Sequence, residues 1–139
     1  MKKTISKSPE ETEAFAAELA GSLKPGSVLA LYGDLGSGKT VFSRGFARGL
    51  GVTEAVTSPT FTIVQEYKLE KGGMLYHLDL YRISDSNAAL VFGIEEFLGD
   101  PKAFALLEWP ERIADILPRD TIKVTISPVD ESTREISIA

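Results

Sequence analysis

A stretch of eight residues carries the side-chain types that hold phosphate groups. It reads Gly-Asp-Leu-Gly-Ser-Gly-Lys-Thr at positions 33–40 and satisfies the pattern G-x-x-x-x-G-K-[ST] in full. Glycines let the backbone wrap around an anion with its N–H groups pointing inward. Lys39 can reach the β- and γ-phosphates as a point charge, and the Thr40 hydroxyl can ligate Mg²⁺. The pattern predicts a nucleotide site, and a glycine-rich turn that matches by chance is the alternative.

The segments on either side of this loop fit the prediction. Ser27–Tyr32 is a continuous apolar run, which is typical of a strand buried on both faces of a parallel sheet. Phe42, Phe46 and Leu50 then recur every four residues and predict a helix. We expect this helix to start at Gly38 and to point its positive N-terminal end at the phosphates. The expected nucleotide contacts in the loop are Gly33, Asp34, Gly36, Ser37, Gly38, Lys39 and Thr40.

Two acidic residues end predicted strands, where the ligands of open α/β sheets bind. Asp79 closes the segment from Met74, and Glu108 closes the segment from Phe104. Either carboxylate could hold Mg²⁺, directly or through water, or orient an attacking water. The alternative is a solvated strand end, and the phosphate loop favours the functional interpretation for both.

Four further side chains have open interpretations. His77, the sole histidine, should share a strand face with Asp79, and a structural histidine is favoured over a site residue. Trp109 is equally well a packing residue or a cover for the nucleotide. Arg82 is favoured as an ion-pair residue over a charge stabiliser. Thr60, after a stiff Ser-Pro step, is either a switch-like threonine or a strand entry.

The base is best predicted as adenine. Phosphate-loop proteins specific for GTP usually carry an N/T-K-x-D element, and the sequence contains no such tetrapeptide. We therefore expect ATP, with Mg²⁺, as the ligand.

The remaining pattern predicts an α/β fold: a single-domain, P-loop NTPase-like mixed sheet flanked by helices, with antiparallel hairpins. Besides the elements around the loop, we expect a capping box at Ser8 and Glu11 and a helix to about Leu23. Gly45 and Gly49 would let the loop helix approach a neighbour closely. The other expected elements are a strand at Lys3–Ser6, strands at Thr62–Leu69 and Met74–Leu80, a helix at Ser84–Leu98 broken near Gly93, a strand at Phe104–Leu107, a short helix at Pro110–Ile116 and a terminal hairpin around Ile122–Ile138.

Composition sets the class of protein. A chain of 139 residues predicts one domain over residues 1–139, and the absence of cysteine excludes disulfides and thiolate chemistry. No apolar run approaches the roughly 20 residues of a membrane helix, and the first residues do not form a secretory signal, so we expect a cytoplasmic protein. The net charge of −5 argues against strong autonomous RNA binding.

Four motifs together resemble the TsaE family of P-loop ATPases. They are GDLGSGKT at 33–40, SPTF at 58–61, HLDLYR at 77–82 and LLEWPER at 106–112, and the resemblance covers nearly the whole chain. It implies a weak Mg²⁺-dependent ATPase, stimulated by partners, that serves the modification of tRNA to N6-threonylcarbamoyladenosine at position 37. The resemblance further implies the TsaD–TsaB transferase pair as partners, with the ATPase cycle resetting the transferase. It implies tRNA contact that is indirect at most, no membrane, and a monomer or weak oligomer when alone.

The resemblance also assigns residue roles. It makes Lys39 the phosphate lysine, Thr40 the magnesium ligand, Asp79 the second-motif acid and Glu108 an acid at the magnesium or the attacking water. It places Trp109 in the same motif as Glu108 and Thr60 at the switch. It further places Glu11, Thr12 and Arg134 around the nucleotide base. One departure is Val41, which stands where many members have a hydroxyl, so an α-phosphate hydroxyl contact from that position is in doubt.

Two other classes use the same loop. A small-molecule kinase also needs carboxylates and Mg²⁺, but Arg112 and Arg119 form no obvious lid cluster and few residues lie beyond the nucleotide core. A nucleotide sensor that does not hydrolyse ATP would carry the same motif. The accessory ATPase is the favoured interpretation.

Overall fold

A computed structural model describes residues 2–34, 36–56 and 63–139. Its strands form one seven-stranded sheet in the order β1-β7-β6-β2-β5-β4-β3. The strands are β1 (Lys2–Ser6), β2 (Val28–Tyr32), β3 (Val64–Lys68), β4 (Met74–Asp79), β5 (Ala103–Glu108), β6 (Ile122–Pro128) and β7 (Arg134–Ile138). The expected strand start at Thr62 lies outside the described residues.

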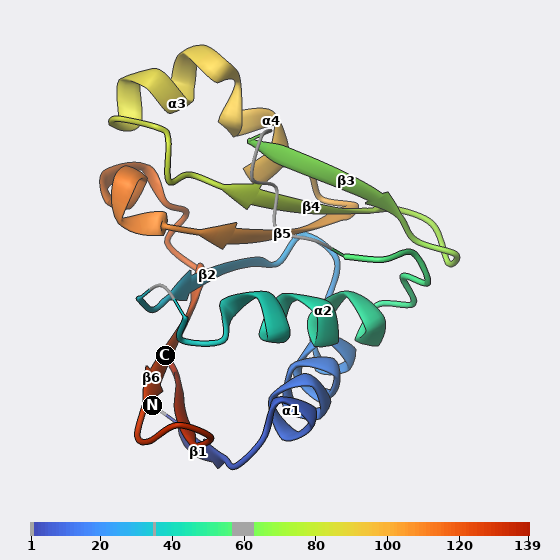
Figure 1. Ribbon diagram of the computed structural model, residues 1–139. Coiled ribbons are helices and arrows are strands. Elements are labelled where there is room, and N and C mark those ends of the chain that lie inside the picture. The colour runs from blue at the N-terminus through green and yellow to red at the C-terminus, as the bar shows by residue number, and fades with distance from the viewer. Residues whose placement is uncertain (1, 35, 57–62) are drawn as a thin grey trace.

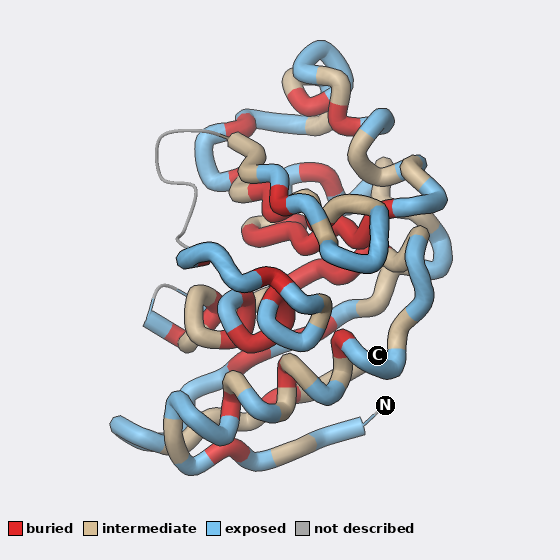
Figure 2. The backbone as a smooth tube through the Cα atoms, turned by 90° about the vertical axis from the view of Figure 1, so that its right-hand side faces the viewer, coloured by how far each residue is buried: buried red, intermediate tan, exposed pale blue. Residues whose placement is uncertain are grey.

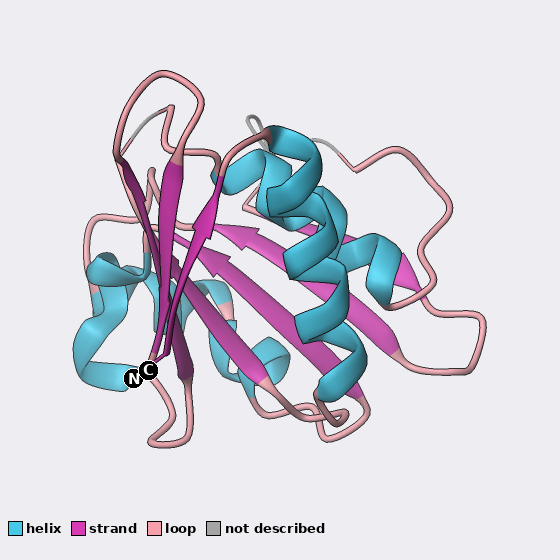
Figure 3. Ribbon diagram, turned by 90° about the horizontal axis from the view of Figure 1, so that it is seen from below, coloured by secondary structure: helices cyan, strands magenta, loops and turns pink. Residues whose placement is uncertain are grey.

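The sheet is parallel at its centre and antiparallel at both edges. β2 pairs in parallel with β5 and with β6, and β5 pairs in parallel with β4. The hairpin strand β3 runs antiparallel to β4, and β7 runs antiparallel to both β6 and β1. The mixed sheet with antiparallel hairpins is therefore confirmed. Figure 3 shows the two chain ends close together, as the pairing of β1 with β7 requires.

Helices cover both faces of the sheet (Figure 1). α1 (Pro9–Ser22) and α2 (Lys39–Gly49) lie on one face, and α3 (Ser86–Phe92) and α4 (Ile94–Leu98) lie on the other. A 3₁₀ segment, η1 (Pro110–Ile116), follows β5. The apolar side chains accordingly form two cores, one between the sheet and α1–α2 and one beneath α3, α4 and η1. In Figure 2 the buried residues lie mainly in the interior of the molecule, and β5 is buried along its whole length. Among the described helices, none combines the length and the apolar character needed to cross a membrane.

The two glycines of α2 let it pack against α1 without space for a side chain. A Cβ on Gly45 would lie 2.3 Å from the Glu13 carbonyl oxygen, and one on Gly49 would lie 2.4 Å from the Ala17 carbonyl oxygen. Glycine costs a helix about 1 kcal/mol relative to alanine, so close packing offsets that cost here. The expected close approach is confirmed, and it fixes α2 beneath the sheet with its N-terminus at the phosphate loop.

The helices begin and end largely where the local sequence predicts. Ser8 caps α1 by accepting a hydrogen bond from the Glu11 N–H, but the Glu11 carboxylate accepts from the N–H of Lys7 instead of returning to Ser8. Because the Lys7 N–H takes the Glu11 carboxylate, the returning half of the predicted capping box is wrong. The expected break at Gly93 is confirmed, because its φ of 96° ends α3 and separates it from α4.

Candidate functional site

The phosphate loop leaves the carboxyl end of the central strand β2 and enters α2. Gly38 is the N-cap of α2 with a φ of 108°, so the helix proper begins at Lys39. Gly36 has a φ of 78°, also in the left-handed region that favours glycine. The Ser37 N–H donates to the Asp34 carbonyl at 3.1 Å and closes the turn. These conformations explain the glycines at positions 36 and 38.

Gly33 and Ser37 are packed against each other inside the loop. A Cβ on Gly33 would lie 2.5 Å from the Ser37 Oγ and 2.9 Å from the Ile126 carbonyl oxygen, so only glycine fits. The Ser37 Oγ is buried and has no hydrogen-bond partner among the described residues. Gly33 is therefore packed inside the loop, whereas Gly36, Gly38, Lys39 and Thr40 line the pocket at the start of α2.

One pocket of about 380 Å³ opens at the start of α2. It combines backbone and side chains from the loop with side chains from three separate strand ends. Its lining consists of Gly36, Gly38, Lys39, Thr40, Val41, Asp79, Glu108, Trp109 and Arg134. The structure thus brings together most of the residues singled out from the sequence. Open sheets bind ligands at such a place, outside the carboxyl ends of the strands.

Lys39 and Trp109 contact each other across the pocket. The Lys39 Nζ lies 4.0 Å from the centroid of the Trp109 ring, in cation–π geometry. Lys39 is buried, with 7% of its surface exposed. Trp109 has a φ of 58°, the one positive φ of a non-glycine residue in the described ranges. A bulky residue in that conformation is strained, and such strain is often found at functional sites.

The two predicted carboxylates are direct neighbours. Asp79 and Glu108 lie opposite each other in the parallel register of β4 and β5. An Asp79 oxygen accepts the Tyr81 N–H at 3.0 Å. Burial raises the pKa of Asp79, and the negative charge of Glu108 adds to this; the Tyr81 hydrogen bond and the charges of His77 and Lys39 act in the opposite direction.

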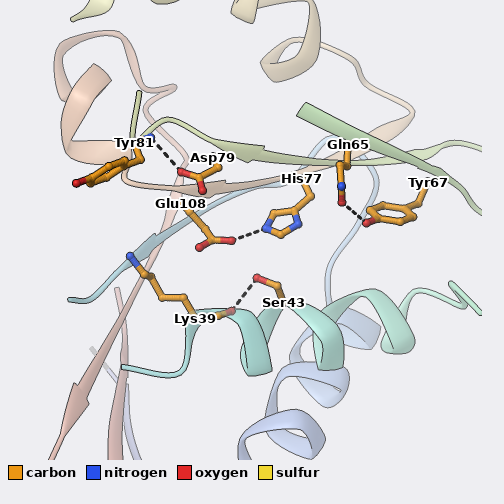
Figure 4. A network of polar contacts seen from close by, with 8 residues as sticks. All are labelled: Lys39, Ser43, Gln65, Tyr67, His77, Asp79, Tyr81 and Glu108. Carbon is orange, nitrogen blue, oxygen red and sulfur yellow. Dashed lines mark hydrogen bonds and ion pairs between the residues drawn. The ribbon is translucent and has the colours of Figure 1, made fainter. Parts of the chain in front are cut away.

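His77 holds one oxygen of Glu108. Its Nε2 lies 2.6 Å from the Glu108 Oε2, and both residues are buried (Figure 4). The sequence favoured a structural role for His77. The signal that could have found this contact is the two-residue spacing from Asp79, which places both side chains on one face of β4.

Arg134 reaches the phosphate loop from the last strand. Its Nε donates to the Ser37 carbonyl at 2.9 Å, and its Nη2 donates to the Gly36 carbonyl at 3.4 Å. Its Nη1 is held by the Asp130 carbonyl at 2.9 Å. Arg134 therefore braces the loop backbone as well as lining the pocket.

Among the described residues, the other predicted nucleotide contacts are not part of the lining of this pocket: Gly33, Asp34, Ser37, Glu11 and Thr12. Thr12 is buried, with its hydroxyl 2.6 Å from the Ser6 hydroxyl. Glu11 lines a different hollow between β1 and α1. Thr60 lies outside the described residues. Arg82, which the sequence left open, is exposed on the surface.

The donor set fits a magnesium–nucleotide ligand better than a bare metal ion. In the described parts of the chain, no group of three or more His, Cys, Asp or Glu side chains could hold a metal. Mg²⁺ at phosphate sites typically takes one or two carboxylates and fills its remaining positions with phosphate oxygens and water. Thr40, Asp79 and Glu108 provide such a partial set in one pocket, next to a buried lysine and a glycine cradle.

A mixed seven-stranded sheet, with a glycine-rich loop joining a central strand to a helix, defines an α/β protein of the P-loop NTPase-like fold. Comparison with known proteins then gives the family. Residues 6–136 match the model of the family described as "Threonylcarbamoyl adenosine biosynthesis protein TsaE". The chain belongs to the TsaE family.

Relatives match over most of their length. The chain is 44% identical over 131 residues to the tRNA threonylcarbamoyladenosine biosynthesis protein TsaE of Bacillus subtilis, covering 93% of this chain and 79% of that protein. It is 40% identical to the TsaE protein of Aquifex aeolicus, covering 99% of this chain and 96% of that one. The crystal structure of Bacillus subtilis YdiB superposes with a TM-score of 0.82 at 39% identity, covering 99% of this chain and 83% of that chain.

Proposed function

We propose that this protein binds and hydrolyses Mg²⁺-ATP as the accessory ATPase of tRNA N6-threonylcarbamoyladenosine synthesis. Its ATPase cycle resets a TsaD–TsaB transferase pair, and the protein does not itself transfer the threonylcarbamoyl group. It works in the cytoplasm, as a monomer or weak oligomer when alone.

The observation that carries the proposal is one shared pocket. Residues from the phosphate loop, the end of β4 and the end of β5 line the same cavity of about 380 Å³. A glycine turn that matched the loop pattern by chance would not place two strand-end carboxylates beside its lysine. Belonging to the TsaE family supports the same function.

Each residue has a role that its position supports. The backbone N–H groups after Gly36 and the N-terminus of α2 bind phosphate oxygens, and Lys39 adds a positive charge there. Thr40 and Asp79 would hold the magnesium ion. The bound ion would neutralise charge that develops on the transferring phosphoryl group. Glu108 orients the attacking water and accepts its proton.

The nucleic-acid substrate is engaged through the partners. The two arginines of α2 are already paired: Arg44 and Arg48 lie 3.3 Å and 3.2 Å from the carboxylate oxygens of Glu13. With a net charge of −5, the chain offers little free positive charge for a phosphate backbone. The relatives that carry the TsaE name are described as tRNA threonylcarbamoyladenosine biosynthesis proteins, and this supports the assignment to that process.

The test is ATP hydrolysis by the purified protein, alone and with TsaD and TsaB. We expect weak hydrolysis alone and strong stimulation by the pair. Lys39→Ala should reduce the stimulated rate by about 100-fold or more, because it removes the positive charge that stabilises the phosphate groups. Lys71→Ala, in the exposed turn of the β3–β4 hairpin, is the matched control and should leave the rate unchanged.

The alternatives give different results. ATP binding without stimulation by the pair would refute the accessory role. Stoichiometric phosphate transfer to a small metabolite would show that the protein is a kinase instead. ATP binding without any turnover would indicate a nucleotide sensor.

A further inference from the structure

We propose that His77 is a positioning residue that fixes the Glu108 carboxylate for its work on the attacking water. The inference rests on the proposed ATPase function, and it assigns to the single histidine of the chain a specific task within it.

The sheet register places the two side chains together. His77 on β4 pairs with Leu106 on β5, and Glu108 is two residues further along β5. His77 and Glu108 are therefore diagonal neighbours on one face of a parallel pair, within reach of long side chains. The His77 Nε2 and the Glu108 Oε2 lie 2.6 Å apart, which is hydrogen-bond distance.

Burial shields the contact between His77 and Glu108 from water. His77 has 1% and Glu108 has 4% of its surface exposed, so water cannot substitute freely for either partner. A carboxylate only accepts hydrogen bonds, which requires the hydrogen on the Nε2 of His77. The other ring nitrogen, Nδ1, has no hydrogen-bond partner among the described residues. Within those residues, the contact with Glu108 is therefore the hydrogen bond that orients the imidazole ring.

The second oxygen of Glu108 is left for the chemistry. In Figure 4, one carboxylate oxygen points at His77 and the other points away from it, on the side where Lys39 lies. Glu108 also lines the pocket. A hydrogen bond to one oxygen restricts rotation of the carboxylate, so its other oxygen keeps a preferred direction. Small displacements of a reacting group cost up to about 100-fold in rate.

Two substitutions of similar size separate positioning from packing. In His77→Gln, the side-chain amide reaches the position of Nε2 and can still donate to Glu108. In His77→Asn, the amide ends near the position of Nδ1 and cannot. We expect His77→Asn to lower kcat by about 10–100-fold with an Mg²⁺-ATP Kd within about threefold of wild type, and His77→Gln to restore most of kcat. Equal losses in both variants, or normal turnover by His77→Asn, would overturn the proposal.

A second readout does not depend on turnover. Because the chain has one histidine, ¹⁵N-histidine labelling yields a single imidazole whose protonated nitrogen can be read by NMR. We expect the hydrogen on Nε2 and a shift of that resonance in Glu108→Ala, with no shift in Glu95→Ala on the exposed face of α4. A hydrogen on Nδ1 with Nε2 bare would overturn the proposal even if the variants failed to fold.

The two hypotheses fail in distinguishable ways. If the wild-type protein with its partners does not hydrolyse ATP, the proposed function is wrong, and the NMR result alone decides whether His77 holds Glu108. If the wild type hydrolyses ATP but His77→Asn does so equally well, only the positioning role is wrong.

Discussion

Asp79 and Glu108 lie opposite each other at the ends of the parallel strands β4 and β5, so two carboxylates lie side by side in one partly buried pocket. Burial, followed by the charge of Glu108 among the raising effects, lifts the pKa of Asp79 above its ordinary value of 3.8. Water would solvate these charges better than this pocket does. Such an arrangement lowers stability in the free protein and suits a site that receives a cation.

Asp79→Asn should therefore stabilise the free protein while impairing its use of ATP. Because the folded-state pKa is raised, the ionised form is disfavoured in the folded state, and stability falls as pH rises from 3.8 through the folded pKa. The variant removes this penalty, and asparagine keeps the acceptor for the Tyr81 N–H. We expect a higher Tm than wild type at pH 7–8 and a difference that shrinks as pH falls toward 4.

Thermal unfolding across this pH range checks the expectation. Asp120→Asn, at an exposed position after η1, is the control and should show little change in Tm. A loss of stability in Asp79→Asn at neutral pH would contradict the assigned cause of the pKa shift.

Glu108→Gln should separate ATP binding from turnover. The amide keeps the shape of the side chain but cannot accept a proton from water, so kcat should fall by about 10²–10⁴-fold. Affinity for Mg²⁺-ATP should stay within about threefold, since phosphate binding depends mainly on the loop and Lys39. Binding by calorimetry and hydrolysis with the partners test this, with Glu95→Gln as control. Normal turnover by Glu108→Gln would remove Glu108 from the mechanism.

Gly45→Ala should destabilise the fold, although alanine is the better helix former. A Cβ at this position would lie 2.3 Å from the Glu13 carbonyl oxygen and force α1 and α2 apart, at a cost of about 1–3 kcal/mol. Gly21→Ala is the matched variant in α1, because nothing lies within 4 Å of its Cβ; it should stabilise by about 0.5–1 kcal/mol. Denaturant unfolding of both proteins measures the contrast, and the same sign for both would refute the packing explanation.

The single tryptophan should report nucleotide binding. Phosphates attract Lys39 away from its position 4.0 Å above the Trp109 ring, which changes the field on the indole. We expect Mg²⁺-ATP to change the tryptophan emission in a saturable way, and Lys39→Met to alter the emission of the free protein and abolish the nucleotide response. An unchanged emission in wild type saturated with Mg²⁺-ATP would show that the Lys39–Trp109 contact persists.

The sequence alone carries the local features of this protein. The apolar run of β2, the glycine-rich loop and the four-residue repeat of α2 depend on neighbouring residues, and all three elements form where the pattern predicts. The break at Gly93 and the close approach at Gly45 and Gly49 follow from backbone sterics that a glycine signals directly. The strand-end positions of Asp79 and Glu108 were also predictable, because parallel strands end at a common edge.

Only the tertiary structure decides which distant side chains meet. The Lys7 N–H competes for the carboxylate that the capping box assigned to Ser8. Arg134 contacts Ser37 because the strand order places β7 beside β6, a pairing that no local pattern encodes. His77 contacts Glu108 through the register between β4 and β5. Residue types and spacing determine the chemistry that is possible, whereas strand order and register determine which residues share a pocket, because they depend on contacts between segments far apart in the chain.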